Sequence, residues 1–230
     1  MFKVVIGLEV HCELDTKSKN FSASPNKFSM IPNESVSTVD LGLPGILPVP
    51  NKEAVRKALL TAMALHCKNP DEVIFDRKNY FYPDLPKAYQ ITQFDMPLCE
   101  HGYIEIEVNG EKKKIYIEEM HIEEDTCKST HRKDKTLLDL NRAGVPLIEI
   151  VTKPCMTTPN EAKLYLEKLR ELYKFAAESV KIIQDRRKKA DDLLSNGVHG
   201  IEEDFKAVES KMNYIGLRFS KQNDFDNELQ

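Results

Sequence analysis

Residues 103–131, YIEIEVNGEKKKIYIEEMHIEEDTCKSTH, contain the strongest folding signal in the chain. Two runs that alternate apolar and polar residues flank Asn109-Gly110, a dipeptide typical of a tight turn between antiparallel strands. The pattern predicts a β-hairpin whose second strand leads directly into the run His121-Ile-Glu-Glu-Asp125. Its three adjacent carboxylates are therefore expected at or just beyond a strand end, where sites are commonly built.

The carboxylates of Glu123, Glu124 and Asp125 repel one another, and a folded protein rarely gathers such groups without a cation to balance them. Oxygen ligands of this kind suit magnesium, which is often held by one or two carboxylates together with phosphates. A solvated acidic turn is the alternative explanation for a charge run of this length.

A second pair of candidate ligands lies near the N-terminus. Residues 2–14 are rich in valine, isoleucine and leucine and predict a strand that contains Gly7. Glu9 and His11 are two residues apart, so both side chains point to the same face of that strand. They are candidate metal ligands, or alternatively an exposed pair on a half-buried strand.

Basic and aromatic residues alternate between Phe75 and Ile91. Arg77, Lys78 and Lys87 are interspersed with tyrosines that include Tyr82. Such a pattern can hold phosphates and stack on nucleotide rings, and it is equally typical of a surface strand whose tyrosines cover the core.

The remaining chain predicts helices around and after these strands. Asn51 caps a helix that extends to about His66, and the proline-rich residues 41–50 predict an ordered, partly buried loop. Residues 145–151 predict a buried strand that begins with Pro146. A Thr158 cap with Glu161 opens a helix expected over 159–195, and a tail helix follows over 201–219. The fold class expected is α+β, mostly an antiparallel sheet with flanking helices and a C-terminal helical hairpin.

Composition and charge place the chain among ordinary soluble proteins. It has 230 residues and a net charge of −4, which gives no overall basic signature for nucleic acid. No apolar run approaches the roughly 20 residues of a membrane helix, and no signal peptide is expected at the N-terminus. The five scattered cysteines indicate reduced thiols, so we expect a cytoplasmic protein with no membrane partner.

Four stretches of the chain resemble the N-terminal part of the B subunit in the aspartyl/glutamyl-tRNA amidotransferase family. They are VIGLEVHCELDTKSKNFS, FDRKNYFYPDLPKAYQITQFDMPL, MHIEEDTCKSTH and LLDLNRAGVPLIEIVTKP. The resemblance implies a cradle-like domain related to glutamine synthetase over residues 1–175. It does not extend to residues 176–230, whose apolar periodicity predicts a helical tail. It also implies ATP and magnesium as cofactors, and subunits A and C, misacylated tRNA and ammonia from the A subunit as partners.

The resemblance also implies roles for individual residues. Glu9, His11 and Glu124 would lie on the metal side of a kinase site, with Glu123 close by. Glu124 would also guide ammonia, and the catalytic lysines Lys78 and Lys87 would line a polar channel or face phosphate. With these assignments, Arg77 and Tyr82 are the candidate nucleotide-binding residues.

The chain departs from the family pattern in two places. Thr126-Cys127 stands where the family has Ala-Gly, and the family's later acidic motif of the Glu-Glu-Gly-Ser type is missing after about Phe175. Three alternatives follow: a chain that takes part in ATP-dependent amidation of Glu-tRNA(Gln) or Asp-tRNA(Asn), a truncated and catalytically silent paralogue that binds the A subunit or tRNA, and a decayed fragment.

Overall fold

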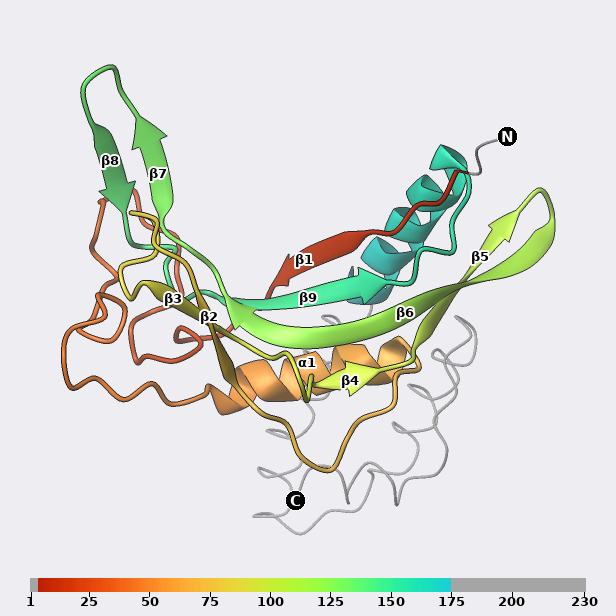
Figure 1. The fold of residues 1–230 in the computed structure, drawn as a ribbon, viewed down its shortest axis with the longest axis horizontal. Helices are drawn as coiled ribbons and strands as arrows, with labels where there is room; N and C mark the ends of the chain where they lie inside the picture. Colours follow the sequence, from red (N-terminus) through yellow and green to blue (C-terminus); the bar gives the residue numbers. More distant parts are fainter. Residues whose placement is uncertain (1–3, 175–230) are drawn as a thin grey trace, which may run out of the picture. The chain divides into compact units, whose positions relative to one another are not determined.

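The computed structural model describes residues 4–174 of the chain. Contacts divide the chain into two compact units, Met1–Arg170 and Glu171–Gln230. The architecture below is that of the first unit (Figure 1). The predicted helical hairpin over 176–230, and the part of the predicted helix beyond residue 174, lie outside the described residues.

A five-stranded antiparallel sheet forms the centre of the first unit. Four strands lie in the order β1-β9-β6-β4, and β5 pairs with the first half of the long strand β6. Their bounds are β1 Glu9–Glu13, β4 Cys99–Glu100, β5 Tyr103–Val108, β6 Glu111–Glu124 and β9 Pro146–Thr152. With helices beside antiparallel strands, the α+β class is confirmed.

The hairpin predicted from residues 103–131 is confirmed. Strands β5 and β6 pair from Tyr103↔Tyr116 to Val108↔Glu111, so Asn109 and Gly110 form a two-residue turn. Both turn residues have positive φ angles, 53° and 83°, which this turn requires and which asparagine and glycine adopt at low cost.

A bulge divides β6 into two halves with opposite phase. The register against β9 shifts between Ile117 and Glu119, so Glu118 is an extra residue. Ile117 and Met120 are both completely buried although they differ in parity. Beyond the bulge, therefore, Glu119, His121 and Glu123 share the face of the sheet opposite to Met120 and Ile122.

The predicted helix after Asn51 is confirmed as α1, Lys52–Ala64, which contacts β6. The Asn51 side chain accepts hydrogen bonds from the amides of Glu53 (2.9 Å) and Ala54 (3.3 Å). The helix ends two residues earlier than predicted, because His66 adopts a φ of 55°. Its buried face consists of small residues, which allow a close approach to the sheet: Ala54, Ala58, Thr61 and Ala62.

Residues 159–174 are helical, as predicted for the described part of that segment. Thr158 Oγ1 accepts a hydrogen bond from the Glu161 amide at 3.2 Å, as expected of the cap. The return bond differs from the predicted capping box, since the Glu161 carboxylate accepts from the amide of Thr157 at 2.7 Å.

The N-terminal strand is shorter than predicted. Ile6 forms a single bridge to Met156, and regular pairing begins at Glu9. Residues 41–50 form no strand, as their prolines predict, but Leu47 is 83% exposed. No helix among residues 4–174 combines the length and apolarity that crossing a membrane requires.

Two small antiparallel pairs complete the described fold. One joins β2 and β3, and the other joins β7 and β8. Their bounds are β2 Asp76–Asn79, β3 Tyr89–Thr92, β7 Lys128–His131 and β8 Thr136–Asp139. The first pair lies beside the end of β6, which carries the acidic run.

Candidate metal centre

Three strands bring a row of polar side chains together on one face of the sheet. The register places His11 of β1 opposite Glu149 of β9, and Glu149 opposite His121 of β6. Directly opposite side chains in a sheet point to the same face and lie in contact range. The order β1-β9-β6 therefore creates a histidine–carboxylate–histidine row from segments far apart in the sequence.

The distances within this row are those of direct polar contacts. Glu149 Oε2 lies 3.1 Å from His121 Nε2 and 3.6 Å from His11 Nε2. Glu123, two residues beyond His121 on the same face of β6, places Oε1 3.0 Å from His11 Nε2. Ligand atoms of His11, Glu123 and Glu149 all lie within 4.8 Å of one another, a spacing that one ion can span.

The two carboxylates have opposite pKa shifts. Burial raises the pKa of Glu123, and the charge of Glu149 raises it further. The hydrogen bond from His121 lowers the pKa of Glu149. Burial acts to lower the pKa of His121, but its hydrogen bond to Glu149 and the charges of Glu149, Glu119 and Glu123 together outweigh this effect and raise the pKa. The centre thus holds a carboxylate that resists ionisation, which an added cation would relieve.

The residues that line a hollow at this centre include His11, Glu123 and Asp125. Gln90 and Glu13 also line the hollow with polar side chains. Burial raises the pKa of Asp125, although Arg142 lies 3.2 Å from its carboxylate and opposes the shift. The hollow therefore opens beside the candidate ligand atoms and offers room for a polar ligand.

The predicted metal-side residues divide into three positions. His11 and Glu123 meet directly. Glu9 is exposed. It lies two residues before His11 on the same face of β1, opposite Val151 of β9. Glu124 follows Glu123 in a strand, so its side chain points to the opposite face.

Glu124 forms a buried ion pair with Lys87 on that opposite face. Its Oε1 also accepts a hydrogen bond from the amide of Ile91 in β3 at 3.0 Å. The side chains of Lys87 and Glu124 are 5% and 4% exposed, respectively. The structure therefore brings two of the predicted catalytic residues together, away from the histidine–carboxylate row.

The other basic and aromatic candidates lie around β2 and β3. Arg77 sits over the ring of Tyr89, with its guanidinium carbon 4.7 Å from the ring centre. Tyr82 is 67% exposed and its ring lies 5.6 Å from that of Tyr80. The charge of Lys78 acts on both carboxylates of the centre and works to lower their pKa values, so this lysine lies within electrostatic range of the metal centre.

Two residues of the centre were not predicted as ligands. Glu149 lies inside a strand that is buried along most of its length. His121 begins the acidic run, but only the carboxylates of that run were considered as ligands. The sequence does contain one signal for Glu149. It is a carboxylate within the apolar run Pro146-Leu-Ile-Glu-Ile150, and an ionisable residue in a buried strand needs a partner.

The Thr126-Cys127 dipeptide fits the loop without backbone strain. Neither residue has a positive φ angle, so the position demands no glycine. The Cys127 side chain is 1% exposed, and its amide donates to the carbonyl of Asp84 at 2.9 Å. The Arg142 guanidinium holds the same loop through the carbonyl of Thr126 at 3.0 Å.

Comparison with known families gives a match over most of the chain. The family model described as "GatB/GatE catalytic domain" matches residues 4–191. The chain belongs to this family. The match extends past residue 175, where the resemblance of individual motifs was expected to stop.

The relatives include the B subunits of the aspartyl/glutamyl-tRNA(Asn/Gln) amidotransferases of Bacillus thuringiensis (strain Al Hakam), Bacillus mycoides (strain KBAB4) and Bacillus cereus (strain AH187). Each is 58% identical over 177 residues, which make up 77% of this chain and 37% of the relative. The chain therefore spans well under half the length of these relatives.

Proposed function

We propose that this chain carries the carboxylate-activating part of the B subunit of a tRNA amidotransferase. The reaction is the ATP-dependent amidation of misacylated Glu-tRNA(Gln) or Asp-tRNA(Asn), with glutamine as the amide donor. The observation that carries the proposal is the meeting of His11, Glu123 and Glu149 in one centre of a chain from the GatB/GatE catalytic domain family. The names of the relatives support the same function.

Magnesium fits this centre as the cofactor that accompanies ATP. Two carboxylates and an imidazole converge there, and the mutual repulsion of Glu123 and Glu149 is the strain that a divalent cation relieves. When bound, the ion would supply the positive charge that neutralises phosphate oxygens. His11 would act as the nitrogen ligand, while His121 orients Glu149 through their 3.1 Å contact.

The lysines and aromatic residues have positioning and binding roles in this proposal. The positive charge of Lys78 acts on the metal centre, where it would attract the transferred phosphate. Arg77 and Tyr82, on the exposed edge of β2 and the loop that follows it, would hold the nucleotide. Glu124 and Lys87 would handle the proton of the nitrogen nucleophile, since a carboxylate can take up a proton as ammonium becomes ammonia.

The wider assembly follows from the same proposal. Residues 1–175 would form the cradle-like catalytic domain related to glutamine synthetase, and residues 176–230 a helical tail. The chain would work in the cytoplasm with subunits A and C, receiving ammonia from the A subunit. The fit of Cys127 to an unstrained loop supports an intact site in this chain.

An amidation assay tests the proposal. The purified chain is combined with family subunits A and C, misacylated Glu-tRNA or Asp-tRNA, glutamine, ATP and magnesium, with a full-length B subunit as the positive control. We expect amidated tRNA from the wild-type chain and none from Glu124→Gln, with Glu107→Gln on the exposed face of β5 as the matched control. No product beside an active control would instead support the silent paralogue that only binds the A subunit or tRNA.

A further inference from the structure

Lys19 is a buried lysine that lies outside the metal centre and has no role in the function proposed above. Its side chain is completely buried, and Nζ lies 3.2 Å from the carbonyl of Leu140 and 3.5 Å from Asp40 Oδ2. Burying an ammonium group is costly unless anions surround it. The charges that act on Lys19 include those of Asp40 and Glu124.

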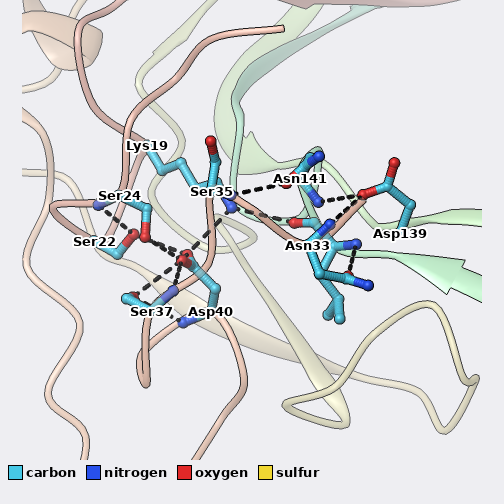
Figure 2. Close-up of polar contacts among 10 residues, drawn as sticks. Lys19, Ser22, Ser24, Asn33, Ser35, Ser37, Asp40, Asp139 and Asn141 are labelled. Carbon is cyan, nitrogen blue, oxygen red and sulfur yellow. Dashed lines mark hydrogen bonds and ion pairs between the residues drawn. The ribbon is translucent and has the colours of Figure 1, made fainter. Parts of the chain in front are cut away.

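Asp40, the first of these anions, is held in place by serines (Figure 2). Its carboxylate accepts hydrogen bonds from Ser22 Oγ at 2.8 Å, from Ser24 Oγ at 2.5 Å, and from the amide and hydroxyl of Ser37 at 2.8 and 3.0 Å. Four donors besides Lys19 therefore fix this carboxylate, so Asp40 provides a rigid counter-charge on one side of the lysine.

Gly144 shows that Glu124 also lies close to Lys19 and Asp40. A Cβ atom added at this glycine would lie 3.0 Å from Asp40 Oδ1, 3.4 Å from Lys19 Cδ and 3.8 Å from Glu124 Oε2. Atoms of all three side chains thus lie within 4 Å of one point beside Gly144. Lys87 pairs with the other oxygen of Glu124, and the charge of Glu124 acts on Lys19, so four charged groups lie close together: Asp40, Lys19, Glu124 and Lys87.

The neighbouring residue, Asn20, holds the backbone between the two carboxylates of β6. Its Nδ2 donates to the carbonyl oxygen of Glu123 at 2.8 Å, and this bond is buried. Its own amide donates to the Gly144 carbonyl at 2.8 Å, and its carbonyl accepts from the Asn51 amide at 2.7 Å. Asn20 is therefore fixed on three sides where it grips the end of β6.

We propose that Lys19 and Asn20 are positioning residues for the two carboxylates at the end of β6. The charge of Lys19 attracts the Glu124 carboxylate in competition with Lys87, and Asn20 holds the backbone that aims Glu123 into the metal centre. The loop that carries Lys19, Asn20 and Asp40 is then part of the reaction machinery. The effect on reaction rate rests on the proposed function, whereas the effects on the carboxylates do not.

The first test observes the Lys87 ammonium group directly. In the full chain labelled with 15N-lysine, the ammonium resonance of Lys87 is assigned by its loss in Lys87→Met. The variant Glu124→Gln removes the charged partner of Lys87. The direction in which it moves the Lys87 resonance is the reference for a weakened pair. We expect Lys19→Met to move the resonance in the opposite direction, because Lys87 then holds Glu124 without a competitor. An unmoved resonance in Lys19→Met overturns the role of Lys19, and Lys17→Met, which changes an exposed lysine, is the control that should leave it in place.

A variant of unchanged volume covers the case in which Lys19→Met does not fold. Asp40→Asn removes the counter-charge that pairs with Lys19, so the attraction of Lys19 to Glu124 is no longer opposed and weakens the hold of Lys87. We expect the Lys87 resonance to move in this variant in the same direction as in Glu124→Gln. If it stays in place, Lys19 does not compete for Glu124.

The second test measures Mn²⁺ binding to the full chain by electron paramagnetic resonance. Groups that orient metal ligands typically change affinity by about 10- to 100-fold when they are removed, and we expect a loss of this size in Asn20→Ala. Asn26→Ala is the matched control, because the Asn26 side chain contacts Leu14 and Thr16 and makes no hydrogen bond to β6. An affinity for Asn20→Ala within about twofold of the wild type overturns the role of Asn20.

The amidation assay then separates this inference from the proposed function. In the complex with subunits A and C, Lys19→Met should lower kcat by about tenfold or more and leave KM for ATP within about twofold. Unchanged kcat overturns the catalytic consequence. A wild-type complex that forms no product refutes the proposed function, while the resonance and Mn²⁺ measurements still decide whether Lys19 and Asn20 position the two carboxylates.

Discussion

Replacing Glu149 with glutamine removes the central carboxylate of the candidate metal centre. Glu149 Oε2 lies 3.1 Å from His121 Nε2 and 3.6 Å from His11 Nε2, so the side chain stands between the two histidines. Glutamine has almost the same size and retains one oxygen ligand, so the variant changes charge with little change in packing. We expect the affinity of the chain for a divalent cation to fall.

The size of the effect follows from the charge that is lost. A divalent ion about 2.1 Å from a carboxylate oxygen gains about 4 kcal/mol even at the dielectric constant of water. The amide oxygen of glutamine keeps part of this as an ion–dipole interaction. If it keeps half, the net loss is about 2 kcal/mol, which corresponds to about a 30-fold increase in the dissociation constant.

The assay is Mn²⁺ binding to the purified chain, followed by electron paramagnetic resonance or calorimetry. Glu107→Gln is the control, because Glu107 is an exposed glutamate on β5 opposite Lys112 in the hairpin. A dissociation constant for Glu149→Gln within about twofold of both the wild type and this control would refute the assignment of Glu149 as a ligand.

Three further predictions concern the buried charges near Glu124. Lys87→Met should lower the free energy of unfolding by about 3 kcal/mol in urea titrations, because it leaves Glu124 without its partner; a change below about 1 kcal/mol would contradict a buried pair. Burial acts to raise the pKa of Asp40, but the hydrogen bond from Ser24 and the charge of Lys19 lower it on balance. This carboxylate therefore stabilises the fold above about pH 4 and loses that effect as the pH falls through its lowered value, so Asp40→Asn should show a shallower loss of stability in acid, measured by thermal unfolding at stepwise pH. Gly144→Ala should destabilise the fold by about 1–3 kcal/mol, because the residue has a φ of 84° and its new methyl group would lie 3.0 Å from Asp40 Oδ1; an unchanged melting temperature would contradict this crowding.

Local signals in the sequence were sufficient for the elements that local interactions determine. Asn109-Gly110 predicted the β5–β6 hairpin because the turn itself needs two residues with positive φ. Asn51 predicted the start of α1 because its side chain satisfies free amides within three residues. Pro146 predicted the start of β9 for the same kind of reason, since a proline is tolerated at the first position of a strand.

The metal centre depends on contacts that no local pattern contains. His11, Glu149 and His121 meet only because β9 lies between β1 and β6, and the register of those pairs decides which side chains are opposite. The sequence placed His11 and Glu123 among the candidates through their chemistry. It could not supply Glu149, because a single carboxylate in a buried strand has many possible partners until the neighbouring strands are known.

Lys19 illustrates the same limit for buried charge. In the sequence it is one of several lysines in a polar loop rich in serine and asparagine, and Asp40 lies twenty-one positions away. Only the folded loop brings Ser22, Ser24 and Ser37 around Asp40, and Asp40 next to Lys19.

The bulge in β6 determines how one acidic run can serve two different sites. Apolar residues occupy odd positions at Ile115 and Ile117 and even positions at Met120 and Ile122, and all four are buried. A regular strand would turn one of these pairs toward solvent, so the extra residue at Glu118 is what keeps both in the core. The same change of phase sends Glu123 to the histidine–carboxylate row and leaves Glu124 facing Lys87. Because adjacent residues of a strand point to opposite faces, the two glutamates have separate partners and separate chemistry, although they are neighbours in the sequence.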